Sequence, residues 1–174
     1  MVSLLRRILI RKLSIRRAGA GWVEPTLLLL TLATLGCWGR APYERKSASE
    51  LIRMLHDRES SVQVQGAYGL SLLGSEAKAA IPDLTEALNG EALVRQNAAL
   101  ALGNIGPDAM EAVPALTKVL RDPEWSVRRQ AAIALGQIGP EAASAVPALE
   151  RLAKDKDKTV SRAAREAVSR IKGK

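Results

Sequence analysis

The sequence contains no phenylalanine, and aromatic residues make up only 3% of its 174 positions. Hydrophobic residues nevertheless account for 47% of the chain, with many alanines and leucines among them. Small and aliphatic side chains favour closely packed helices over sheets. The composition therefore predicts an all-α fold of one-domain length.

Cysteine and histidine occur once each, as Cys37 and His56. A single cysteine excludes an intramolecular disulfide, and a single histidine excludes a metal site built on two histidines. A nucleophilic triad needs a base near a serine or cysteine, and Cys37 precedes the part of the chain that we expect to fold. We expect His56, near the end of a helix, to be solvated. The sequence predicts no enzymatic activity, no metal and no cofactor.

The net charge of +8 belongs mainly to the two ends of the chain. Residues 1–37 hold six lysines or arginines against Glu24 alone, and residues 154–174 hold eight basic residues against three acidic ones. Residues 38–153 are slightly acidic. Because nucleic-acid binding needs a basic surface on the folded body, this distribution argues against a nucleic-acid partner.

No apolar run is as long as a membrane-spanning helix, which needs about 20 residues. The run TLLLLTLATLG covers residues 26–36, and its eleven residues fit the core of a secretory signal, about 7 to 15 residues long. The residues from Thr34 to Cys37 then resemble the bacterial lipobox, in which the cysteine is lipid-modified and becomes the mature amino terminus. The resemblance implies lipid attachment at Cys37. It also implies an exported protein, anchored to a membrane on the periplasmic or envelope side of a bacterium.

Residues 1–37 are therefore predicted to be a lipoprotein-type signal peptide or a membrane anchor. A basic amphipathic targeting helix is a further alternative, because apolar residues such as Leu5 and Leu9 lie among arginines such as Arg6 and Arg11. Residues 38–47 have the composition of a linker.

One block of the sequence occurs twice, 33 positions apart. Residues 94–106 read VRQNAALALGNIG and residues 127–139 read VRRQAAIALGQIG. Weaker copies begin at Val62 and Val160. A period of this length is typical of stacked units, each with an apolar face that only its neighbours cover.

Each unit is predicted to contain two antiparallel helices. In the third unit, the first helix covers 113–120 and ends before Pro123, and the second runs from the N-cap Ser126 to Gly139. The predicted units are 47–74, 76–106, 108–139 and 141–172. The sequence thus predicts an α-solenoid of about four helix-turn-helix repeats over residues 48–174, with a basic last unit as a cap.

The repeated pattern V-R-x-x-A-A-x-A-L-G-x-I-G-P, followed by A-V-P-A-L, resembles HEAT repeats, in particular the short subset named after phycobilisome bilin lyases. The resemblance implies a protein-interaction module. The name of the subset implies an alternative, a bilin-lyase-like enzyme or enzyme subunit, and some HEAT-like proteins suggest a nucleic-acid-binding function as a third.

The same resemblance implies a ladder of hydrogen bonds between units, built from an Asp six residues before an Arg. Asp122 and Arg128 fit this pattern, and Asn89 and Arg95 fit it in part. The ladder is expected to be degraded in the first and last units, where for example Asp155 faces a serine. We expect these residues to be structural.

A row of polar residues is expected on the concave side of the second helices. It contains Gln65, Gln96, Asn97, Asn104, Arg129, Gln130 and Gln137. Amides and arginine can hydrogen-bond a partner chain at little desolvation cost, although an ordinary solvated face would have the same composition. The sequence therefore predicts a non-enzymatic scaffold for protein–protein interaction, with a protein partner and a membrane tether through lipidated Cys37.

Overall fold

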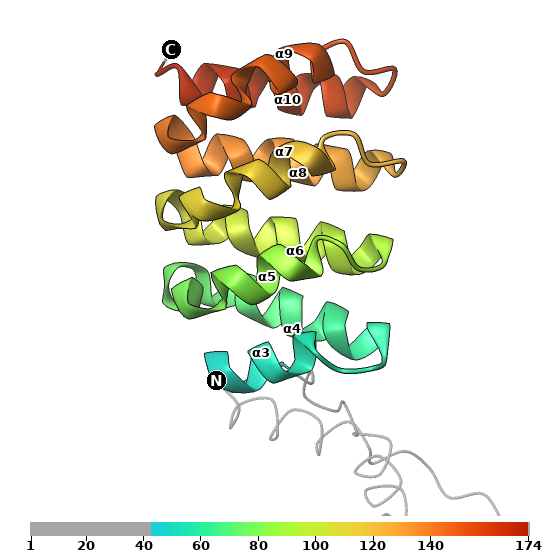
Figure 1. Cartoon of the computed structure of the whole chain (residues 1–174), viewed down its shortest axis with the longest axis vertical. Coiled ribbons are helices and arrows are strands. Elements are labelled where there is room, and N and C mark those ends of the chain that lie inside the picture. Colours follow the sequence, from blue (N-terminus) through green and yellow to red (C-terminus); the bar gives the residue numbers. More distant parts are fainter. Residues whose placement is uncertain (1–42, 174) are drawn as a thin grey trace, which may run out of the picture. The chain divides into compact units, whose positions relative to one another are not determined.

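The computed structural model describes residues 43–173 of the chain. These residues contain α-helices and short 3-10 helices, and there is no strand among them. The helices form a stack of hairpins, with the second helices of successive hairpins packed against one another (Figure 1). The predicted fold class, an all-α solenoid of helical repeats, is confirmed.

Each of the four repeats is a hairpin of a shorter first helix and a longer second helix. The first helices are α3 (Ala48–Leu55), α5 (Ile81–Ala87), α7 (Val113–Val119) and α9 (Val146–Leu152). The second helices are α4 (Ser60–Leu73), α6 (Ala92–Ile105), α8 (Trp125–Ile138) and α10 (Lys158–Ile171). Three 3-10 helices connect the repeats, η1 (Gly74–Ala80), η2 (Gly106–Ala112) and η3 (Gly139–Ala145).

Proline separates each 3-10 helix from the α-helix that follows it. Pro114 lies in the first turn of α7, where its missing N–H leaves no helical hydrogen bond to the preceding turn. Ala109, inside η2, has non-helical angles of φ −82° and ψ 18°. The prolines of α5 and α9 hold the same position, and the non-helical angles recur inside η3 at Ala142, with φ −89° and ψ 16°.

Glycine ends α4, α6 and α8 in a conformation that other residues rarely adopt. Gly106 and Gly139 have φ values of 79° and 81°. In this region a side chain would be strained, which explains the glycine at this repeat position. At the other end of α8 the predicted N-cap, Ser126, is wrong: the helix begins at Trp125, and the N-cap is Glu124.

The core runs through the stack as a series of leucines in equivalent positions. Leu70, Leu102 and Leu135 on the second helices are fully buried, as are Leu84, Leu116 and Leu149 on the first helices. Burial of one such side chain contributes about 1.5–3 kcal/mol. Since all six leucines belong to one continuous core cluster that runs through the four repeats, the free energy of burial belongs to the stack and not to one hairpin.

Small residues bring the second helices close together. A Cβ atom added at Gly136 of α8 would lie 2.9 Å from the Cα of Ala167 in α10, and one at Gly103 of α6 would lie 2.9 Å from the Cα of Ala134 in α8. Real Cβ atoms do not approach backbone this closely, so the helices could not pack at this distance with alanine there. Gly103 and Gly136 are thus packing residues.

Candidate functional site

Arginine and aspartate side chains pair across the boundary between the second and third repeats. Arg95, in the first turn of α6, donates from Nε to Oδ2 of Asp122 at 2.7 Å and from Nη2 to Oδ1 at 2.8 Å. Its Nη1 donates to the carbonyl oxygen of Gly90 at 2.8 Å. One guanidinium group therefore holds a turn of its own repeat and the turn of the next.

The next boundary repeats this arrangement. Arg128 donates from Nε and Nη2 to the carboxylate of Asp155 at 2.8 and 3.1 Å, and from Nη1 to the carbonyl oxygens of Asp122 and Pro123. The Arg128 and Asp155 side chains are only 9% and 10% exposed. Asp122 thus serves two arginines: its carboxylate accepts from the preceding repeat, and its backbone carbonyl from its own.

The structure distributes the ladder residues differently from the sequence pattern. Asp155, which the pattern left without an arginine, accepts the bidentate pair from Arg128. The side chain of Asn89 forms no hydrogen bond with Arg95 and instead donates to the carbonyl oxygen of Glu86 at 3.1 Å. The signal that finds the pairs is the constant spacing of 27 residues from each arginine to its aspartate.

Pairing with arginine shifts the pKa values of these carboxyl groups. Hydrogen bonds from Arg128 hold the pKa of Asp155 below its usual value, against the opposing effect of burial. For Asp122, burial raises the pKa, but the hydrogen bonds from Arg95 and from the Glu124 amide outweigh it and the net shift is downward. Both groups therefore stay ionised at pH values where a free aspartate begins to take up a proton.

A second set of hydrogen bonds crosses between repeats near the carboxyl ends of the second helices. Nδ2 of Asn104 donates to the carbonyl oxygen of Ser71 at 3.0 Å, and Nε2 of Gln137 donates to Oδ1 of Asn104 at 3.3 Å. These bonds join α4, α6 and α8. Asn104 and Gln137, predicted to contact a partner, thus hold neighbouring repeats together, and Asn97 donates to Leu93 of its own helix.

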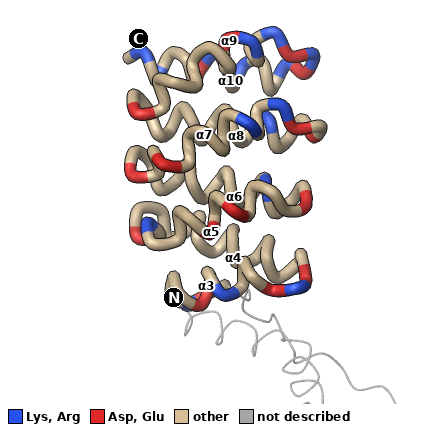
Figure 2. The backbone as a smooth tube through the Cα atoms, viewed as in Figure 1, with Lys and Arg blue, Asp and Glu red and all other residues tan. Residues whose placement is uncertain are grey.

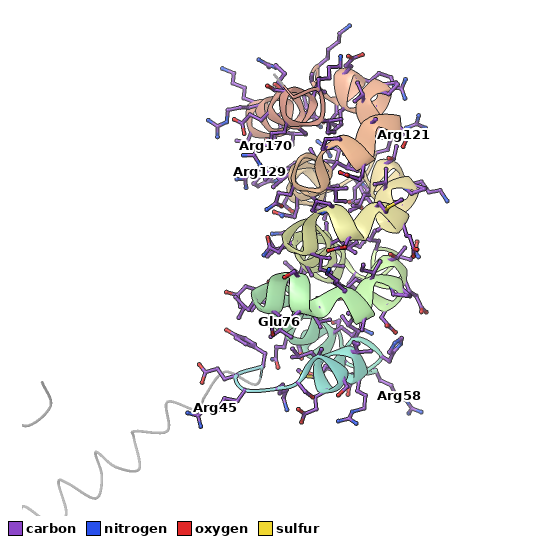
Figure 3. The ribbon with its side chains drawn as sticks, turned by 90° about the vertical axis from the view of Figure 1, so that its left-hand side faces the viewer. Arg45, Arg58, Glu76, Arg121, Arg129 and Arg170 are labelled. Atoms are coloured by element: carbon purple, nitrogen blue, oxygen red, sulfur yellow. The ribbon has the colours of Figure 1, made fainter. Side chains whose placement is uncertain are left out.

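The other residues of the predicted row leave their side chains available. Within residues 43–173, no hydrogen bond or ion pair engages the side chains of Gln65, Gln96, Arg129 and Gln130. Figure 3 shows Arg129 and Arg170 on the side of the second helices, opposite Arg121 of the first-helix side. We call Gln65, Gln96, Arg129 and Gln130 the second-helix row.

Large apolar side chains are also exposed on the second helices. Leu72 of α4 is 60% exposed, Leu93 of α6 is 62% exposed, and Trp125 of α8 is 48% exposed. Aromatic and arginine side chains that protein partners bury most productively are therefore accessible on these helices.

Lysine and arginine gather in the last two repeats, around α8, α9 and α10 (Figure 2). The basic residues of the last repeat are exposed, among them Lys154, Arg162 and Arg170. This is the distribution expected of a capping repeat, whose outer face meets water.

Further predictions from the sequence concern His56, metal binding and Cys37. Nε2 of His56 lies 2.7 Å from Oδ1 of Asp83, so this histidine joins the first repeat to the second. In the described part of the chain there is no cluster of three or more potential metal-ligating side chains, and no helix of sufficient length and hydrophobicity to span a bilayer. Cys37 and the whole of residues 1–37 lie outside the described residues.

A sequence profile of HEAT repeats matches residues 81–169, which is half of the chain. The chain belongs to the HEAT-repeat family. HEAT repeats generally mediate binding between proteins. No curated protein matches the chain significantly.

Solved structures of engineered proteins share the fold. One engineered protein is 28% identical with a TM-score of 0.63, and the alignment covers 72% of this HEAT protein and 62% of the other. A second is 25% identical with a TM-score of 0.62, covering 72% and 64%. A designed armadillo repeat protein is 22% identical with a TM-score of 0.60, covering 71% and 64%, and is similar in fold alone. The chain thus spans less than two thirds of each of these structures.

We expect the buried arginine–aspartate ladder to stabilise the fold. Replacing Arg128 with Met removes the partner of a carboxylate that is 10% exposed, so we expect the free energy of unfolding to fall by about 3 kcal/mol or more. Replacing Lys78, whose ion pair with Asp108 is about half exposed on both sides, should change it by less than about 0.5 kcal/mol. Urea denaturation of the full-length variants measures both. Equal effects of the two substitutions would contradict a structural role for the ladder.

Proposed function

We propose that this HEAT-repeat protein is a non-enzymatic scaffold that binds a partner protein along its second helices and is tethered to a bacterial membrane through a lipid on Cys37. The observation that carries the binding part is the second-helix row: Arg129 is exposed, Gln65, Gln96 and Gln130 are half-buried, and none of the four side chains makes a hydrogen bond or ion pair with a described residue. The exposed Leu72, Leu93 and Trp125 add apolar contact area on the same helices. A mixed surface of this kind is typical of protein interfaces.

The arrangement of the row favours an extended partner. Its members come from three successive second helices, α4, α6 and α8, which stack side by side. Neighbouring helices pack about 8–10 Å apart, so the row offers donors and acceptors at regular intervals along the stack. The ladder and the hydrogen bonds that link Ser71, Asn104 and Gln137 fix these intervals before binding. This lowers the entropic cost of association.

The tether is supported by the sequence before the repeats. The apolar run 26–36 has the length of a signal core, and it is followed directly by Cys37, the single cysteine of the chain. Acylation would give this otherwise unpaired thiol a role. Residues 38–47 would then lie between the lipid and the first repeat.

A pair of charge reversals tests the binding surface. The full-length protein would be cross-linked in cells of the source organism, and co-purified proteins quantified by mass spectrometry. Arg129→Glu, in the second-helix row, should reduce recovery of a specific partner about tenfold, which corresponds to about 1.4 kcal/mol. Lys118→Glu, an exposed substitution of the same kind on α7, should retain that partner. A partner that is retained by both variants, or lost from both, would contradict binding through the second helices.

Substitution of the cysteine tests the tether. We expect Cys37→Ser to move the protein from the membrane fraction to the soluble fraction and to abolish metabolic labelling with a fatty acid. Ser3→Ala, which leaves Cys37 in place, serves as the control and should remain labelled. Unchanged labelling of the Cys37→Ser variant would refute lipid attachment at this residue.

A further inference from the structure

The boundary between the first and second repeats lacks the arginine–aspartate pair of the other two. Gln63 of α4 holds the position of Arg95, and Asn89 holds the position of Asp122. Nε2 of Gln63 donates to the carbonyl oxygen of Asp57 at 2.7 Å, as Arg128 does to Asp122 in its own repeat. Gln63 and Asn89 do not hydrogen-bond to each other, so the bond that crosses the boundary at the other two places is missing here.

A cleft lies where the pair is missing. Its volume is about 360 Å³, and it is lined by the ends of α3 and α5 and by the turn that precedes α6. Its apolar walls come from Leu55, Ala87 and Val94. Gln63 is shorter than an arginine and lacks the guanidinium group. The cleft therefore has room for a longer side chain at this boundary.

The polar groups around the cleft are mainly unused hydrogen-bond acceptors. The carboxylate of Glu86 has no hydrogen bond or ion pair with any described residue, and neither Oε1 of Gln63 nor Oδ1 of Asn89 accepts a hydrogen bond from one. Asp83 accepts from His56, the one basic side chain in the lining. The charge left unpaired at the cleft is therefore negative.

Acceptors around an apolar wall match the chemistry of an arginine side chain. Its methylene stem packs on apolar surface, and its planar guanidinium group carries five N–H donors and a permanent positive charge. The same molecule provides the precedent, because Arg95 occupies the equivalent place one repeat further on, between a carboxylate and the carbonyl of Gly90. Lysine has the charge without the fork.

We propose that the cleft between α3 and α5 binds an arginine side chain of the partner protein, which supplies in trans the guanidinium that this boundary lacks. The inference rests on the proposed scaffold function, since it assumes a protein partner, but it assigns the arginine to a different surface. Figure 3 labels Arg58, of the α3–α4 turn, on the side away from Arg129. The partner would therefore contact the protein at two places.

A titration with the isolated side chain tests the cleft directly. The full-length, ¹⁵N-labelled protein is titrated with N-acetyl-arginine amide, and amide shifts are followed by NMR. We expect saturable shifts at the amides of Asn89 and Gly90, and binding about tenfold weaker for the citrulline analogue, which is neutral and nearly isosteric. The lysine analogue should bind more weakly than arginine. No saturable shift at these amides, or equal affinity for arginine and citrulline, would overturn the proposal.

Variants separate the cleft from general charge effects. Glu86→Gln should weaken arginine binding severalfold, whereas Glu76→Gln should not change it, because Glu76 is an exposed glutamate of η1 that does not line the cleft. Gln63→Arg combined with Asn89→Asp should fill the cleft from within and abolish the shifts. If the double variant does not fold, the Glu86→Gln variant tests the proposal alone. The assignment would be overturned if the Glu86→Gln variant bound arginine as tightly as the Glu76→Gln variant. The outcome is independent of Arg129→Glu, so failure here leaves the second-helix row to its own test.

Discussion

The stack depends on the register between repeats, because each hairpin buries its apolar side chains only against its own two helices and the hairpins on either side. The leucines of adjacent repeats meet only when the second helices are aligned along their length, and the close approach of Gly136 to Ala167 leaves little room for sliding. Burial supplies the free energy of this arrangement. The bidentate arginine–aspartate pairs add directional contacts that are satisfied in one register alone.

The polar side chains of the second helices differ in whether they form contacts between repeats. Arg95, Arg128, Asn104 and Gln137 form contacts between repeats, whereas the side chains of Gln65, Gln96, Arg129 and Gln130 make no hydrogen bond or ion pair with any described residue. At the first boundary Gln63 holds the position of the arginine, and the hydrogen-bond acceptors around the cleft therefore have no guanidinium donor. Both surfaces proposed to bind a partner are thus built from positions that the ladder does not use.

The repeat architecture could be predicted from the sequence because glycine, proline and the apolar positions recur with a fixed period, and each has a local physical reason to be where it is. The hydrogen-bond partners of the polar side chains could not be predicted from the sequence. Asp122 and Arg128 are six residues apart, and the pattern alone does not show that the carboxylate turns to the preceding repeat and the backbone carbonyl to its own. Nor does the period show that Asn104 reaches the carbonyl of Ser71, since which amide faces a neighbouring helix depends on the rotation of α6 in the stack. Residues 1–37, on which the lipid attachment was predicted, lie outside the described part.

The central claim, that the arginine–aspartate pairs couple the repeats, is tested most directly by native-state hydrogen exchange of the two terminal second helices. Within the described residues, α4 and α10 each have a neighbouring repeat on one side, but the boundary of α10 carries the Arg128–Asp155 pair and that of α4 carries Gln63 and Asn89. The account predicts that the slowest amides of α10 exchange at least about tenfold more slowly than those of α4, a difference of about 1.4 kcal/mol in opening free energy. Equal protection of the two helices, or stronger protection of α4, would contradict it.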